Sequence, residues 1–195
     1  MPKNHQQIPK SEREAAIVEH ARALFLTKGY RGTSMSAVAS AAGLATGAVN
    51  WYFPSKDDLF AAVVTSYFDE ERARIESDPE IGGDPGRELV SALTTLVPYR
   101  ALHREAYERM DGSEAVRTAY AQVQEWVDNR LIAAIADRVP AGADIESVAE
   151  VAHVLIEGIL ISGRRRDRPT GDLVEMIIGL LSAAVMGNAI AAKAN

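Results

Sequence analysis

The chain of 195 residues has no cysteine. This absence excludes disulfide bridges, a thiol nucleophile and metal sites built on thiolates. Several catalytic patterns are absent as well, because the sequence contains no phosphate-binding P-loop, no G-x-G-x-x-G, no H-E-x-x-H and no nucleophile elbow. We therefore expect no catalytic residues, no metal and no cofactor, and we predict that the chain is not an enzyme.

The sequence also lacks a secretory signal and a clear membrane span. The segment Met1–Lys10 is polar and contains two prolines. The uncharged segment Met176–Ala192 is short for a span of about 20 residues, and Gly179 and Asn188 interrupt it. We expect this segment to be a buried packing helix, and we expect a cytoplasmic protein with no membrane partner.

The net charge of −6 argues against a nucleic-acid partner, but the charge is unevenly distributed. Residues 1–56 hold seven Lys/Arg against three Asp/Glu, whereas residues 57–195 hold 14 against 24. A basic head on an acidic body suits a protein that touches DNA at one end only.

Period-two runs of β-branched residues are missing, and the pattern predicts an all-α fold of about nine helices. Ser11 with Glu14, and Ser55 with Asp58, have the spacing of capping boxes. Gly29 is expected to end the first helix. The remaining helices are expected at about 35–42, 46–52, 55–77, 85–97, 99–110, 113–138, 145–163 and 171–192, with a loop at 77–86.

The stretch from Thr33 to Lys56 reads TSMSAVASAAGLATGAVNWYFPSK. It predicts two short helices around a tight turn at Gly43-Leu44, ended by Pro54, and its alanines let the two helices pack closely. This is a helix-turn-helix, in which the second helix enters the major groove of DNA.

At these residues the sequence resembles the TetR family of bacterial transcriptional regulators. The resemblance rests on Gly29-Tyr30, Thr33-Ser34, Ala41-Ala42-Gly43-Leu44, Gly47, and Tyr52-Phe53-Pro54-Ser55-Lys56 followed by Leu59 and Phe60. It covers about residues 11–70, and beyond them the chain is similar to the family only in helical character and length. It implies an N-terminal arm (1–10), a DNA-binding domain (11–70, helix-turn-helix 34–53) and a ligand-sensing and dimerisation domain (71–195).

The resemblance also implies which residues contact DNA. Those expected to reach phosphates or base edges are Ser34, Ser36, Thr46, Gly47, Ala48, Asn50, Trp51, Tyr52 and Lys56. The chemistry agrees, since an asparagine can pair with adenine and a threonine can meet a thymine methyl. Many members of the family have Ser-Lys where this chain has Ala45-Thr46, so the third helix is expected to lack a hydroxyl cap of about 1 kcal/mol.

The body is expected to form a homodimer and to bind a small-molecule effector. Small and apolar side chains on the last two helices predict the dimer interface: Leu155, Ile159, Gly179, Ala183 and Gly187. Aromatic and polar side chains between 85 and 163 are expected to line the effector pocket: Tyr99, His103, Tyr107, Met110, Tyr120, Trp126, His153 and Glu157. Each pocket residue has an alternative as ordinary core or surface, and the apolar helices have an alternative as a monomeric core. His153 and Glu157 share a helix face, but no third metal ligand is evident.

Together these observations predict a regulator, most simply a repressor, that binds a palindromic double-stranded DNA operator as a homodimer and is released by a small molecule. Two alternatives remain at this stage: a DNA-binding regulator without a small-molecule ligand, constitutive or controlled by a protein partner, and a transcriptional activator.

Overall fold

The computed structural model describes residues 9–162 and 167–194, with side chains of the last helix described through residue 188. These residues form nine α-helices, one 3-10 helix and no strand, which confirms the all-α prediction. The elements are α1 (Lys10–Lys28), α2 (Met35–Ala41), α3 (Thr46–Tyr52), α4 (Lys56–Ser77), α5 (Pro85–Thr95), η1 (Val97–Tyr99), α6 (Arg100–Arg109), α7 (Glu114–Ala136), α8 (Glu146–Ile161) and α9 (Thr170–Ala194).

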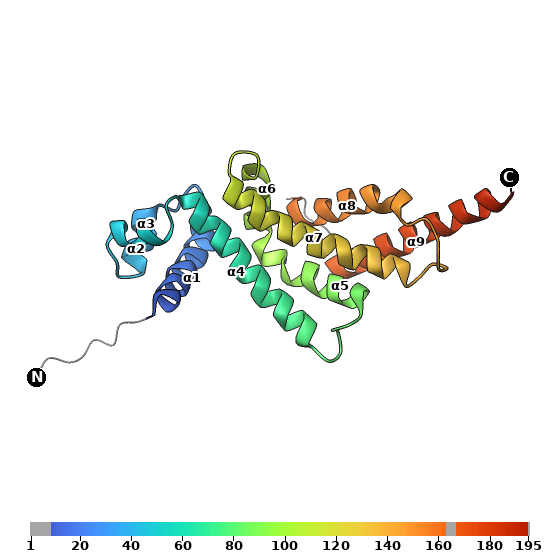
Figure 1. Ribbon diagram of the computed structural model, residues 1–195, viewed down its shortest axis with the longest axis horizontal. Helices are drawn as coiled ribbons and strands as arrows, with labels where there is room; N and C mark the ends of the chain where they lie inside the picture. Colours follow the sequence, from blue (N-terminus) through green and yellow to red (C-terminus); the bar gives the residue numbers. More distant parts are fainter. Residues whose placement is uncertain (1–8, 163–166, 195) are drawn as a thin grey trace, which may run out of the picture.

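The molecule is elongated, with a small head of α1 to α3 at one end and the bundle of α5 to α9, the body, at the other (Figure 1). Helix α4 runs between them, packing on α1 in the head and on α7 in the body. A boundary at residue 70 therefore falls inside one continuous helix that both parts share.

An aromatic cluster fills the centre of the head. Phe25 of α1 stacks on Tyr30 at 5.8 Å between ring centroids, and Phe60 of α4 meets both rings edge-on. Burying such rings contributes both apolar area and favourable edge-to-face geometry. The cluster fixes α1 to the start of α4, and Val38 and Val49 attach the two short helices to the same core.

Caps set the helix boundaries, with one departure from expectation. Ser55 and Asp58 form the predicted capping box at the start of α4. Ser11 does not cap α1, because the helix begins at Lys10, where the carbonyl of Pro9 accepts from the amides of Glu12 and Arg13. The ring of Pro9 already fixes φ near −51°, so the chain enters the helix before a serine cap is needed.

A polar network ties the far end of α4 to the body. Glu76 accepts hydrogen bonds from Trp126 Nε1 at 3.0 Å and Arg130 Nη2 at 3.1 Å. Arg130 also pairs with the buried Glu88, which accepts from the amide of Gly83 at 2.7 Å. Charge-assisted bonds of this kind hold the α4–α5 loop against α7.

Helix α9 is the element whose burial differs from expectation. Residues 170–188 are long and apolar enough to span a membrane by composition, but this is weak evidence, and only 28% of the window is buried within the chain. Leu180 is 63% exposed, and Met176 and Met186 are also at the surface. One copy of the chain therefore does not bury this helix.

Candidate DNA interface and effector cavity

The predicted recognition helix α3 presents its polar face to solvent. It buries only Val49, while Thr46, Gly47 and Asn50 are exposed. Trp51 is 67% exposed, its ring meets Tyr52 edge-on, and the ammonium of Lys10 lies 4.8 Å from its centroid. Tyr52 and Ala48 are half-buried. A polar, partly aromatic surface with a lysine beside it suits a nucleic-acid groove.

The turn before α3 has the expected geometry. Gly43 has φ 67°, a left-handed conformation that glycine adopts without steric cost. The amide of Leu44 then donates to the carbonyl of Ala39 at 2.8 Å and closes α2. Helix α3 starts at Ala45 with no side-chain cap, as the replacement of a serine there predicts.

The start of α2 places two of the expected DNA-contacting hydroxyls together. Ser34 caps the helix by accepting from the amide of Ala37 at 3.1 Å, and its Oγ lies 2.9 Å from Ser36 Oγ. Both side chains are exposed.

Lys56 lies differently from a free surface lysine. Its Nζ donates to the carbonyls of Tyr30 and Thr33, each at 3.0 Å, and lies 4.0 Å from the centroid of the Tyr30 ring. An ammonium has three donors, and two of them are occupied within the head. Lys56 therefore closes the loop before α2 and retains one donor for any other partner.

A second polar cluster joins the head to the body, and no pattern in the sequence predicts it. Arg109 at the end of α6 makes a two-pronged hydrogen bond to Asp57, at 2.9 and 3.0 Å, and lies 4.0 Å over the ring of Tyr30. The Tyr30 hydroxyl also donates to Asp57. Burial alone raises the pKa of Asp57, but the hydrogen bonds from Arg109 and Tyr30 outweigh it and hold this pKa below its ordinary value. We call Tyr30, Asp57 and Arg109 the latch.

The residues expected to line one effector pocket lie in three places, two of which meet where the ring of Tyr120 lies 6.0 Å from that of His103. His103 is buried in the centre of the body, where Tyr67 Oη lies 2.8 Å from its Nε2. Tyr99 is half-buried against this core and stacks on Tyr67 at 4.6 Å. Burial lowers the pKa of His103 to about 4, so its imidazole is neutral at pH 7. Met110 packs against the edge of the same core, and Tyr107 is exposed on α6.

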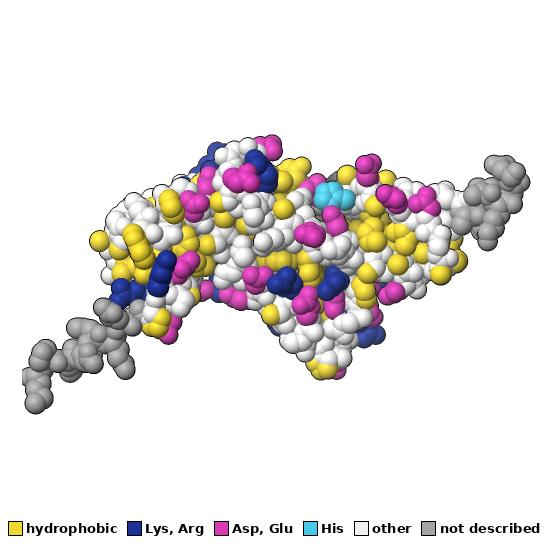
Figure 2. All heavy atoms as spheres, in the orientation of Figure 1, with side chains coloured by type: hydrophobic (Ala, Val, Ile, Leu, Met, Phe, Trp, Pro, Cys, Tyr) yellow, Lys and Arg dark blue, Asp and Glu magenta, His cyan; other side chains and the backbone are white. Residues whose placement is uncertain are grey.

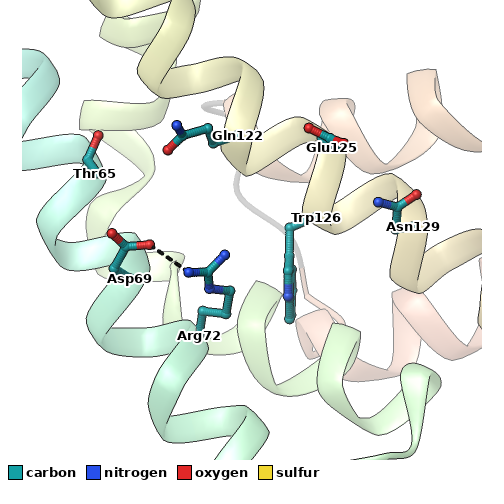
Figure 3. A pocket seen from close by; sticks show the side chains of 7 residues that line it. All are labelled: Thr65, Asp69, Arg72, Gln122, Glu125, Trp126 and Asn129. Atoms are coloured by element: carbon teal, nitrogen blue, oxygen red, sulfur yellow. Dashed lines mark ion pairs between the residues drawn. The ribbon is translucent and has the colours of Figure 1, made fainter.

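Trp126 belongs to a different surface. It lines an open groove of about 600 Å³ between α4 and α7, with Asp69 and Arg72 on one wall and Glu125 on the other (Figure 3). Asp69 and Arg72 form an ion pair at 3.1 Å. The groove carries both signs of charge and is open to solvent. The ring of Trp126 is held edge-on against Phe68, 5.9 Å between centroids.

Tyr120, His153 and Glu157 form the third group, around a cavity between α7 and α8. Two further polar residues, Gln124 and Asp128, line this cavity and were not among the expected ones, nor were three apolar ones: Val127, Ile156 and Leu160. Gln124 donates to Glu157 at 3.2 Å, and Asp128 lies 2.9 Å from Nδ1 of His153. The signal was present, because each helix carries two polar residues four positions apart, which places them on one face.

The expected dimer residues lie mostly on one exposed surface. Figure 2 shows apolar side chains gathered over the C-terminal helices. Val154 is 64% exposed, and Leu155, Gly179, Ala183 and Gly187 are at the surface. Ile159 is only 6% exposed and packs inside the chain, so it is not available to a partner.

Comparisons with known proteins agree with this arrangement. Residues 17–63 match the model of the family described as bacterial regulatory proteins, tetR family. An uncharacterised transcriptional regulator, YuxN of Bacillus subtilis, is 33% identical over 94 residues, which is 48% of this chain and 32% of that protein. The repressor AcnR of Corynebacterium diphtheriae is 23% identical over 184 residues, 90% of this chain and 92% of its own length.

A solved structure extends the likeness to the whole fold. A transcriptional regulator of Saccharomonospora viridis, in complex with choline, superposes with a TM-score of 0.64 at 19% identity, covering 88% of this chain and 96% of that one. The named relatives are transcriptional regulators and not enzymes, in agreement with the missing catalytic patterns. With its helix-turn-helix head and its helical body, the chain resembles the TetR family of bacterial transcriptional regulators, whose model matches residues 17–63.

Proposed function

We propose that the chain is a cytoplasmic, ligand-responsive repressor that binds a palindromic operator as a homodimer. The observation that carries the DNA-binding role is α3, which buries only Val49 and leaves the side chains of Asn50 and Trp51 at the surface. The similarity to the repressor AcnR supports repression.

In this proposal each head binds one half-site. Thr46, Asn50 and Trp51 read base edges, Gly47 and Ala48 allow close approach, and Ser34, Ser36, Tyr52 and one donor of Lys56 contact phosphates. The domains remain as the sequence proposed, with residues 11–70 binding DNA and residues 71–195 binding the effector and a second copy. Residues 1–8 of the proposed arm lie outside the described part of the chain.

A second copy is the partner proposed for α8 and α9. Leu180 and Val154 are each more than 60% exposed, and leaving such side chains in water forfeits about 1.5–3 kcal/mol apiece. Gly179, Ala183 and Gly187 follow one another at four-residue spacing, and no other atom lies within 4 Å of a Cβ built at either glycine. Another helix can therefore approach closely. A twofold dimer presents two recognition helices, which explains the expectation of a palindrome.

The proposed effector site is the α7–α8 cavity, and the latch is the proposed connection from it to the head. Tyr120, His153 and Glu157 line the cavity, and α6 packs on both α7 and α8. Because α6 also carries Arg109, a shift of α6 changes the position of Asp57 at the start of α4. The effector reduces DNA affinity only by its preference for the shifted state. The structure of a similarly folded transcriptional regulator with bound choline supports a small-molecule effector in general.

Selection of random duplex DNA by the purified protein, at fixed salt and with sequencing of the bound pool, tests the proposal. An enriched palindrome is expected. A pool with no enriched sequence at low salt would contradict an operator-binding role, and an enriched site without twofold symmetry would contradict the dimer. If the operator complex stays intact with candidate ligands at saturating concentration, this result would favour the alternative of a regulator without an effector.

The same selection with Asn50→Ala tests the recognition helix. This variant should lose about 1–3 kcal/mol of specific binding and relax the preference at one base pair in each half-site. Ser40→Ala, an exposed change on α2 outside the proposed contacts, serves as the control and should keep the wild-type consensus. An unchanged consensus for Asn50→Ala would remove Asn50 from the base-reading residues.

A further inference from the structure

The cavity between α7 and α8 is built from two matched polar pairs. Gln124 faces Glu157, and Asp128, one turn later on α7, faces His153, one turn earlier on α8. The two helices therefore run antiparallel here, and four polar side chains surround a single space with Tyr120. Apolar side chains complete the wall: Val127, Ile156 and Leu160.

Tyr120 points to an occupant of this space. Its side chain is fully buried, and its hydroxyl has no hydrogen-bond partner among the described residues. A buried hydroxyl left without a partner costs roughly 1–3 kcal/mol, so such groups are normally paired with protein, water or ligand. The neighbouring Glu157 and Gln124 are already bonded to each other, and they do not supply that partner.

The charge of the cavity selects the sign of the occupant. Two carboxylates, Asp128 and Glu157, line it, and among the described residues no lysine or arginine does. Even with a protonated His153 the lining retains a net negative charge. Burial, followed by the charge of Glu157, raises the pKa of Tyr120. An anion is therefore disfavoured here, and a cation is favoured.

The size of the cavity selects the shape of the cation. Its volume is about 10 Å³, room for about one water molecule. A primary ammonium group is close to that size and has three N–H donors, which match the Tyr120 hydroxyl and the two carboxylates. A trimethylammonium group is several times larger and has no N–H donor. The space holds only the ammonium head, so an alkyl chain attached to it must leave the cavity past its apolar wall.

We propose that this cavity binds the ammonium head of a protonated primary alkylamine, and that such an amine is the class of effector to which the protein responds. The second part rests on the proposed function, whereas binding at the cavity can be measured without DNA.

Isothermal titration calorimetry of the full chain with n-butylammonium chloride tests the binding step. Tetramethylammonium chloride and sodium butyrate at the same ionic strength are the comparison probes. Saturable binding of butylammonium, with at least 10-fold weaker binding of both comparison probes, is expected. Equal heats for all three salts, or tighter binding of tetramethylammonium, would overturn the assignment.

Three variants locate the site. Glu157→Gln keeps the side-chain size and should weaken butylammonium at least 10-fold, and Tyr120→Phe should weaken it several-fold. Glu125→Gln removes the same charge from the open face of α7 and should bind like the wild type. Circular dichroism melts check that each variant is folded. Equal affinity in Glu157→Gln and Glu125→Gln would place the amine elsewhere and overturn the proposal.

Operator release separates this inference from the proposed function. With the selected operator as probe, butylammonium should lower the affinity of the wild type and have at least 10-fold less effect on Glu157→Gln. An operator complex that ignores butylammonium, in a protein that selects a palindrome, would overturn the amine as effector and leave the repressor intact. Failure to select any operator would count against the proposed function, and calorimetry would still decide the cavity.

Discussion

The head and the body place their chemistry in opposite positions. In the head, aromatic rings are buried, and the side chains proposed to act are exposed on α3 and at the start of α2. In the body the polar groups of interest are buried, as in Tyr67, His103 and Tyr120, whereas apolar side chains of α8 and α9 are exposed. The head thus already exposes the side chains that are proposed to contact DNA. In the body, the proposed effector site is buried, and the proposed dimer surface is exposed.

The largest effect is expected where the exposed apolar surface is broken. Leu180→Asp places a charge at the centre of the proposed dimer interface, so the chain should become monomeric. Operator affinity should then fall toward the non-specific range, roughly 10³-fold or more. Sedimentation equilibrium and fluorescence anisotropy measure the two effects. Val97→Asp, at an apolar site on η1 that is 39% exposed, is the control. A monomeric Leu180→Asp with unchanged operator affinity would contradict the paired heads.

The next effect concerns the buried imidazole of the body. His103 has a pKa of about 4 when folded and 6.5 in its ordinary state, so the unfolded chain binds a proton that the folded chain rejects. The stability from this group is complete above pH 6.5 and falls as the pH drops toward 4, by up to about 3 kcal/mol. Urea unfolding of wild type and His103→Leu should show this slope in the wild type only. Parallel pH profiles would refute a neutral buried imidazole.

The latch between the two regions should give a smaller effect with its own pH dependence. Asp57→Asn should destabilise the chain by about 1–3 kcal/mol at pH 7. Because the folded pKa of Asp57 is lowered, this difference should hold above pH about 4 and shrink as the pH falls through the folded pKa. Denaturant unfolding at several pH values measures it. Asp69→Asn, in an exposed ion pair, should change stability by less than about 0.5 kcal/mol. Equal effects at both aspartates would show that the latch is an ordinary surface pair.

The smallest change compares one glycine in each region. Gly47 of α3 and Gly158 of α8 both have room for a Cβ, since no atom lies within 4 Å. Alanine at either position should stabilise the fold by up to about 1 kcal/mol through helix propensity. Only Gly47→Ala should also weaken operator binding, because its added methyl faces the proposed DNA surface. Thermal melts and anisotropy test the pair, and unchanged operator affinity in Gly47→Ala would mean that the backbone does not approach DNA closely.

The helix boundaries of the head could be predicted almost completely from the sequence, because glycine, proline and capping residues determine them. Gly29, Gly43, Pro54 and the Ser55–Asp58 box each have one dominant local effect, and all act where expected. The start of α1 was wrong by a residue or two because two starting signals overlap. Pro9 already sets the backbone angle at the start of the helix, so the hydroxyl of Ser11 is not needed as a cap.

The body was less predictable, because residue type does not say which way a side chain faces. Tyr120 and Trp126 were assigned to one pocket, yet six residues along a helix correspond to about 240° of rotation. Tyr120 is accordingly buried beside the α7–α8 cavity, whereas Trp126 lines the α4–α7 groove. The pairing of Gln124 with Glu157 was not predictable in the same way, since it depends on the register between two helices. Ile159 lies inside the chain although Leu155, one turn earlier, is exposed.

The hydrogen bonds and ion pairs of Glu76, Glu88 and Arg130 hold one end of α4 in place, so the helix can tilt about that end. The helix has 22 residues and is therefore about 33 Å long, with the α4–α5 end pinned to α7 and the head attached at the other end. A tilt of about 5° about the pinned end sweeps the head through about 3 Å, close to the 3.4 Å step between successive base pairs. Such a small tilt leaves the packing of the body undisturbed, yet it displaces the head by nearly one base-pair step along the DNA.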